Sequence, residues 1–258
     1  MRLFWKFIGM HFRAQTQYRA SFLLTIGGQF LTAFSALVAV YFLMDRFHAI
    51  GGFSLSEILL CFAIILMAFS LAECFVRGFD RFPSVLANGG FDRILVRPRG
   101  AMLQVLCSQI EFSRLGRLVQ AVLVFCYAIP ASPVVWTADK IALLILMIAS
   151  GVAVFSGLFV IRAALCFYTT EGLEFMNIFT DGSREFGAYP FGIFGETLLR
   201  FYTYVVPIAL VQYYPLLYLT GRSTSLWHFA APAIAFVFLV PCRLIWSIGI
   251  RHYRSTGS

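Results

Sequence analysis

The residues best suited to chemistry in this 258-residue chain are the arginines of one basic segment, FDRFPSVLANGGFDRILVRPRG at 79–100. It contains four arginines, two prolines and three glycines, with Phe79, Phe82 and Phe91 interleaved among the charges. Guanidinium groups donate charge-assisted hydrogen bonds to carboxylates and phosphates, and aromatic rings serve as buried anchors in interfaces. The chemistry indicated is therefore binding, either to an acidic protein surface or to anionic lipid.

A second set of candidates surrounds Glu171 and Glu174, which lie three residues apart and hence on one face of a helix. If that helix crosses the membrane, each carboxylate needs a charged partner or water. Arg162 and Arg184 flank the two acids, so the four residues are candidates for lining a transport pathway or pairing inside the membrane. Alternatively, the acids lie among headgroups at the cytoplasmic end of the helix, and the sequence favours this second interpretation.

The sequence contains no motif for metal binding, nucleophilic catalysis or nucleotide binding. The six cysteines form no CxxC pair and the four histidines are scattered, so we expect no metal site. A phosphate-binding loop requires G-x-x-x-x-G-K-[ST], and neither Lys6 nor Lys140, the two lysines, has that context. We therefore expect no catalytic residue, no bound cofactor and no ATPase site in this chain.

The composition predicts an integral membrane protein. Hydrophobic residues make up 60% of the chain and charged residues only 12%, whereas soluble domains have about 25% charged residues. The net charge of +8 is spread over separate loops rather than gathered in one polar domain, which argues against nucleic-acid binding.

The apolar runs predict an all-α fold with six transmembrane helices. Residues 1–20 form an amphipathic pattern, with Arg2, Lys6 and Arg13 on one face, that is typical of a helix lying in the membrane interface. Prolines at 232 and 241 are expected to kink the last span. The expected spans are 21–44, 55–76, 105–130, 141–161, about 167–188 and 226–250.

The region from 162 to 221 allows two topologies with the same number of crossings. Hydropathy alone selects 201–219 as the fifth span and leaves a long cytoplasmic loop before it. In the other topology a more polar helix at about 167–188 is the fifth span, and the proline-broken segment 190–220 enters the outer leaflet and returns. Such non-helical backbone is tolerated where protein or a cavity covers it.

Orientation follows from the positive residues. The N-terminal arm carries four and the 77–117 region seven, whereas the connections 45–54, 131–140 and 221–225 carry one each. Both termini and the loop 77–104 are therefore expected in the cytoplasm. Within this loop, Pro83 predicts a short helix that Asn88-Gly89-Gly90 ends, and a second short helix should begin near Phe91. We also expect Glu73 to pair with Arg77, four residues later.

The runs GFDRILVRPRG, YPFGIFGETLLRF and VVPIALVQYYPLLYLTG, in this order, resemble the type-2 permease class of ATP-binding-cassette (ABC) exporters. The resemblance covers essentially the whole chain and is closest to the branch with two short six-span permeases. It implies a coupling helix in the loop 77–104 that docks on a separate ATPase, and a re-entrant segment at 190–220, which favours the fifth span at about 167–188. Carried over to this chain, the ATPase-coupling residues are Phe79, Arg81, Phe82, Phe91, Asp92, Arg93 and Arg97.

The resemblance also implies partners, localisation and function. Two ABC ATPase subunits would bind ATP and Mg, and a second permease, identical or related, would complete the pathway in a lipid bilayer. The complex would lie in the inner or plasma membrane of a bacterium and export a hydrophobic or amphipathic substrate. The alternatives are a secondary transporter or channel-like protein, and a membrane-embedded transferase; the sequence shows neither internal repeats nor an HxxxD or DxD motif.

Overall fold

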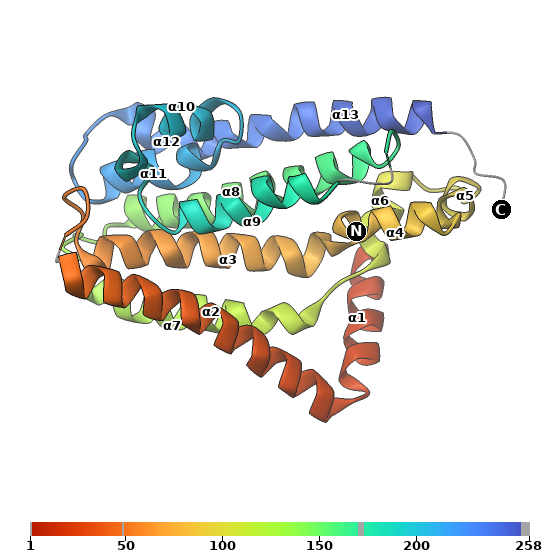
Figure 1. Ribbon diagram of the computed structural model, residues 1–258, viewed down its shortest axis with the longest axis horizontal. Helices are drawn as coiled ribbons and strands as arrows, with labels where there is room; N and C mark the ends of the chain where they lie inside the picture. Colours follow the sequence, from red (N-terminus) through yellow and green to blue (C-terminus); the bar gives the residue numbers. More distant parts are fainter. Residues whose placement is uncertain (1, 48, 170–172, 254–258) are drawn as a thin grey trace.

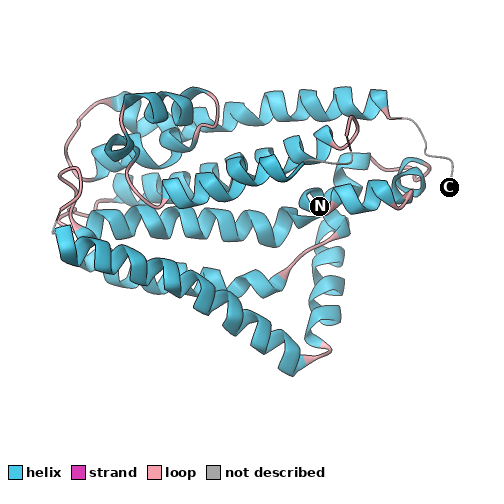
Figure 2. Ribbon diagram, viewed as in Figure 1, coloured by secondary structure: helices cyan, strands magenta, loops and turns pink. Residues whose placement is uncertain are grey.

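The computed structural model describes residues 2–47, 49–169 and 173–253, and within these ranges every regular element is a helix (Figures 1 and 2). The long helices lie side by side along one direction. The short helices α4, α5 and α6 lie at one end of this bundle, together with the start of α1 and the end of α13, and α10 lies towards the other end (Figure 1). The all-α prediction is confirmed for the described residues.

Five stretches of the described chain are long and apolar enough to cross a membrane. At 1.5 Å per residue, even a 20-residue helix matches the roughly 30 Å of a bilayer core. They comprise α2 (Arg19–Phe47), α3 (Leu55–Asp80), α7 (Leu115–Ala131) with the 3-10 turn before it, α8 (Ala138–Leu165), and α12 (Leu226–Ala235) continued by α13 (Leu239–His252).

Helix α3 is the centre of the fold. Ser54 caps its first turn, because its hydroxyl accepts from the backbone N–H of Glu57 while the Glu57 carboxylate accepts from the Ser54 N–H. Nearly every side chain from Ile58 to Phe69 is buried, which is expected for a helix surrounded on all sides by others. It packs against α7, α8, α9 and α11.

Helix α2 is peripheral and packs mainly on α7. The two backbones approach closely at Gly116, where an added Cβ would lie 2.1 Å from the carbonyl oxygen of Ile26. Helix α1 (Arg2–Thr16) joins the outer end of α2 at a steep angle (Figure 1). The predicted N-terminal helix is confirmed as a helix, and its place in the membrane interface stays a prediction.

The region before the last span consists of short helices in its described residues. Helix α9 (Met176–Gly187) has 12 residues, about 18 Å, and is too short to cross alone; residues 170–172 lie outside the described part. A continuous span at 201–219 is wrong, because α10 (Glu196–Tyr204) and α11 (Ile208–Leu219) are separate helices. Pro207 lies between them, and proline disfavours helical geometry at the residue before it. The count of six crossings stays a prediction.

The expected third span, 105–130, is divided in the structure. Helix α6 (Ala101–Ser108) ends before an extended stretch at 109–111, and α7 begins only after the turn Phe112–Arg114. The second half of α6 lies close against α3, since an added Cβ at Gly78 would lie 1.9 Å from the Val105 carbonyl oxygen. The break turns Glu111 towards the arginines described below. The last span is also interrupted, by the 3-10 turn Phe236–Phe238, because Pro241 has no N–H to donate to the Val237 carbonyl.

Candidate functional site

The basic segment forms the two short helices that its prolines and glycines predict. Helix α4 (Phe82–Ala87) has Pro83 in its first turn, where a missing N–H costs nothing. Gly89 follows with φ of 63°, a left-handed conformation that glycine adopts without strain, and α5 (Gly90–Leu95) begins there. Both predicted helices are confirmed.

The aromatic rings of this segment point into the chain. Phe79 is 2% exposed, and Phe82 and Phe91 are 0% exposed. They form an aromatic cluster with Phe167, Trp246 and Tyr253, in which neighbouring ring centroids lie 4.9–6.0 Å apart. The expectation that these three phenylalanines contact an ATPase needs correction, because this chain's own rings already cover them. Their role is to attach α4 and α5 to the ends of α3, α8 and α13.

The exposed part of the segment is its tip, residues 93–99. Val96 is 83% exposed, and Arg93, Arg97 and Arg99 are exposed without an ion pair among the described residues. Gln104 holds the tip in place by donating from Nε2 to the Ile94 carbonyl at 2.9 Å and to the Arg99 carbonyl at 2.8 Å. The tip therefore presents three cations and two apolar side chains, Leu95 and Val96, on a fixed backbone.

Two further predicted coupling residues lie outside the tip and contact other parts of the chain. Asp92 accepts a hydrogen bond from the Tyr253 hydroxyl at 2.9 Å, which joins α5 to the end of α13. Arg81 is half-exposed and lies 3.7 Å from Glu111. Asp92 thus contributes to the attachment of the tip, whereas Arg81 keeps one side towards solvent.

A charge network connects this end of α3 to its neighbours. Glu73, 5% exposed, accepts ion pairs from Arg77 at 3.2 Å, Arg114 at 3.5 Å and Arg117 at 2.8 Å. The pair with Arg77 was predicted from its spacing and is confirmed. The pairs with Arg114 and Arg117 fix α7 to α3 through one buried carboxylate.

Two further carboxylates extend the network towards the loop and α8. Glu111 pairs with Arg77 at 3.4 Å and with Arg114 at 3.1 Å. Asp80 pairs with Arg77 at 2.7 Å and with Arg162 of α8 at 2.6 Å. Three acids therefore hold arginines from α3, α7 and α8, and one of these acids, Asp80, is the last residue of α3.

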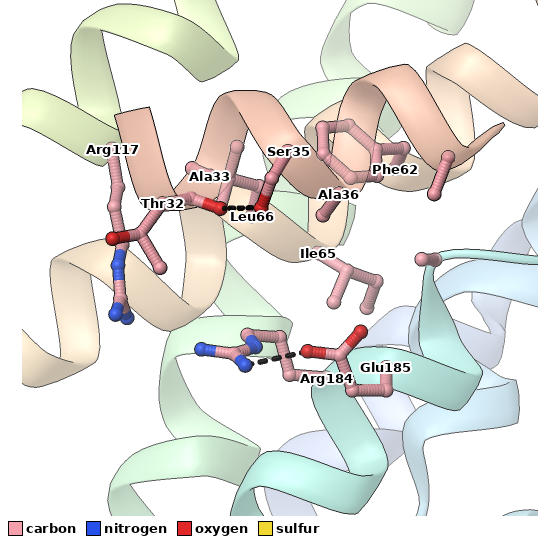
Figure 3. A pocket seen from close by; sticks show the side chains of 12 residues that line it. Thr32, Ala33, Ser35, Ala36, Phe62, Ile65, Leu66, Arg117, Arg184 and Glu185 are labelled. Atoms are coloured by element: carbon pink, nitrogen blue, oxygen red, sulfur yellow. Dashed lines mark hydrogen bonds and ion pairs between the residues drawn. The ribbon is translucent and has the colours of Figure 1, made fainter. Parts of the chain in front are cut away.

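A polar cavity of about 390 Å³ lies beside this network, between α2, α3, α7 and α9 (Figure 3). Arg117 and Arg184 line it together with Glu185, and the hydroxyls of Thr32 and Ser35 face it from α2. The Arg184 guanidinium pairs with Glu185 and lies 5.1 Å from the ring centroid of Phe69. The described residues hold no cluster of His, Cys, Asp or Glu that could bind a metal ion.

A family model described as "ABC-2 family transporter protein" matches residues 30–257. The chain belongs to the ABC-2 transporter family. It is accordingly a permease subunit of an ABC transporter and a multi-pass membrane protein. Comparisons with curated proteins and with solved structures found no match.

In this ABC-2 permease the three described members of the predicted intramembrane set do not pair with one another. Arg162 pairs with Asp80 and donates to the Asn177 side chain, and Arg184 pairs with Asp181 and Glu185. Glu174 is exposed in the turn Leu173–Phe175, and Glu171 lies outside the described residues. Glu174 forms no ion pair with either arginine among the described residues, and a pathway role for the two acids stays a prediction. Arg184 does line the polar cavity.

The residues missed from the sequence are the network partners on α7 and in the break before it. Glu111, Arg114 and Arg117 follow an i, i+3, i+6 spacing that would have indicated one helical face. The common partner of Arg114 and Arg117 is Glu73, some forty residues earlier, and no local pattern predicts that contact. Thr32 and Ser35 lie within an apolar run, and nothing in the sequence indicated that they line a cavity.

Proposed function

We propose that this ABC-2 permease transmits movement from a separate ATP-hydrolysing subunit to its spans through the tip at 93–99, and exports an amphipathic substrate. The observation that supports the proposal is the difference between the outer and inner surfaces of the loop 77–104. Arg93, Arg97 and Arg99 at its tip are exposed and form no ion pair among the described residues, whereas the phenylalanines on its inner side are buried against the bundle. A loop built in this way suits the transfer of force from a docked partner.

The attachment involves three spans at once. Phe79 belongs to α3, and its ring centroid lies 5.3 Å from that of Trp246 on α13. Phe82 stacks edge-on against Phe167, which follows α8 directly. A force applied to the tip would therefore reach α3, α8 and α13 together rather than bend the loop.

Charge indicates the chemistry of the docking surface. Arg93, Arg97 and Arg99 form charge-assisted hydrogen bonds most strongly with carboxylates, and Val96 can enter an apolar pocket between them. We propose an acidic groove with an apolar floor on the ATPase. Two such ATPases and a second permease, identical or related, would complete the exporter, with ATP and Mg bound only by the ATPases.

The substrate class follows from the polar cavity. Its walls combine the hydroxyls of α2 and the charges of Arg117, Arg184 and Glu185 with the apolar side chains of Phe62, Ile65 and Leu66. A ligand there would need both a polar and an apolar part. We propose outward transport, with both termini in the cytoplasm of a bacterial cell, and a re-entrant arrangement of α10 and α11 at the opposite end.

The test is charge reversal at the tip. We expect Arg93→Glu with Arg97→Glu to abolish co-purification of the ATPase, or its substrate-stimulated hydrolysis, while the permease still inserts and unfolds at the wild-type temperature. The matched control is Arg13→Glu, an exposed arginine of α1 outside the tip, which should leave both properties unchanged. Unaltered assembly and transport in the double variant would refute the docking role.

A second measurement separates this function from a secondary transporter or channel. The purified permease alone should hydrolyse no ATP, and transport by the reconstituted complex should stop when non-hydrolysable nucleotide replaces ATP. Transport that continues without any ATPase, driven by an ion gradient, would establish the alternative.

A further inference from the structure

Gln120 is a buried amide without a hydrogen-bond partner. Its residue is 1% exposed, and neither Oε1 nor Nε2 has a partner among the described residues. A buried primary amide can donate two hydrogen bonds and accept two, and leaving them unmade costs free energy. An unpaired amide in an apolar region is therefore a sign that something absent from this chain completes it.

The amide lines a groove that is otherwise apolar. The groove has a volume of about 520 Å³ and is formed by side chains of α2, α3 and α7. Phe30 and Phe42 mark its extent on α2, and Gln120 and Tyr127 mark it on α7. Gln120 lies one turn after Gly116, which contacts α2 next to Phe30, so the amide belongs to that end of the groove.

The dimensions of the groove select a chain-like occupant. Phe30 and Phe42 are twelve residues apart, about 18 Å along α2. A volume of 520 Å³ over that length leaves a cross-section of about 30 Å², whereas an α-helix with side chains is about 10 Å wide and needs more than twice that area. A helix of a second subunit does not fit into it, but one extended alkyl chain does.

The polar group at the end of that alkyl chain must form hydrogen bonds with the side-chain amide of Gln120. A group with one donor and one acceptor side by side can form two hydrogen bonds to Gln120 at the same time. A protonated carboxyl group has this arrangement, because its hydroxyl donates while its carbonyl accepts. Carboxyl groups in apolar surroundings favour this neutral form.

We propose that the groove between α2, α3 and α7 binds a long-chain fatty acid from the bilayer, with its neutral carboxyl group on Gln120 and its alkyl chain running towards Tyr127. The site is distinct from the polar cavity of Figure 3, which lies towards α9 and shares none of its lining residues with the groove. Helix α2 packs mainly on α7 and contacts α3 less. The alkyl chain of the fatty acid would therefore also fill the space between α2 and α3.

The experiment uses the full chain, assembled with its partner subunits, in vesicles of phosphatidylethanolamine and phosphatidylglycerol. The probe is palmitic acid with a photoreactive diazirine in its chain, and the control probe is its methyl ester, which lacks the donor. After irradiation, labelled peptides are identified by mass spectrometry. We expect the acid to label peptides from 30–42 and 120–127 roughly tenfold more than the ester, as the loss of one to two hydrogen bonds implies.

Three variants make the result specific. In Gln120→Leu the acid and the ester should label equally, and stability should not fall, since an unpaired buried amide is replaced by an apolar group of similar size. Leu123→Trp, which fills the groove, should remove labelling by both probes. Val119→Trp, an exposed α7 position outside the groove, should change neither.

Three outcomes would overturn the proposal. The first is equal labelling by acid and ester in the wild type, and the second is an acid preference that survives Gln120→Leu. The third is groove labelling in the isolated permease that disappears in the assembled complex, because another subunit would then cover the groove. None of these outcomes depends on transport, so the proposed function can fail or stand independently.

Discussion

The carboxylate of Glu73 should be the most important single ionised group for the stability of this permease. In Glu73→Gln, Arg77 keeps Asp80 and Glu111, and Arg114 keeps Glu111. Arg117 has no other ion-pair partner among the described residues, and its side chain is 11% exposed. The substitution therefore leaves one buried cation uncompensated.

The expected loss of stability in Glu73→Gln follows from the burial of Arg117. Removing one member of a buried pair and leaving the other charge costs about 3–5 kcal/mol. At about 2–4 °C for each kcal/mol in a chain of this size, we expect the unfolding temperature in detergent to fall by at least about 6 °C. The measurement is intrinsic tryptophan fluorescence during heating of the purified chain.

Two further variants test the reason for the effect. Combining Glu73→Gln with Arg117→Met removes the stranded cation and should recover at least about half of the loss. Glu196→Gln breaks an exposed pair with Arg200 and should cost less than about 1 kcal/mol. The reasoning is refuted if Glu73→Gln and Glu196→Gln behave alike, or if the double variant is less stable than Glu73→Gln alone.

Two more predictions concern packing and orientation. Gly78→Ala should destabilise the chain by about 1–3 kcal/mol, because the new Cβ meets the rigid carbonyl of Val105, whereas Gly100→Ala, with open space around it, should have little effect in the same melting assay. In a background without reactive cysteines, Val135→Cys should react with a membrane-impermeant maleimide on intact cells, and Val96→Cys only after permeabilisation. The reverse labelling pattern would contradict the proposed orientation.

Local chemistry predicted part of the site well. Pro83 and the Asn88-Gly89-Gly90 run determine the ends of α4 by backbone geometry alone, and the Glu73–Arg77 pair follows from helical spacing. These features depend on residues within a few positions of one another. They could therefore be predicted from the sequence without knowledge of the tertiary fold.

Contacts between distant residues could not be predicted in the same way. Asp80 and Arg162 are 82 positions apart, and hydropathy contains no information about which helices become neighbours. The burial of Phe82 and Phe91 likewise depends on Trp246 and Tyr253, so a loop rich in aromatic and basic residues looks the same in sequence whether its rings face a partner or the chain itself. A polar helix was predicted at about 167–188, and α9 lies within it, but the length of that helix could not be inferred from its apolar and polar boundaries.

The aromatic cluster has a consequence for biosynthesis. Phe79, Phe82 and Phe91 are synthesised early, whereas Trp246 and Tyr253, which cover their rings, follow at least 155 positions later in the sequence. Until then the nascent protein exposes three phenylalanines beside a cationic surface. The attachment of the proposed docking loop is thus completed only after α13 has been synthesised, so a chain interrupted before α13 would lack this attachment.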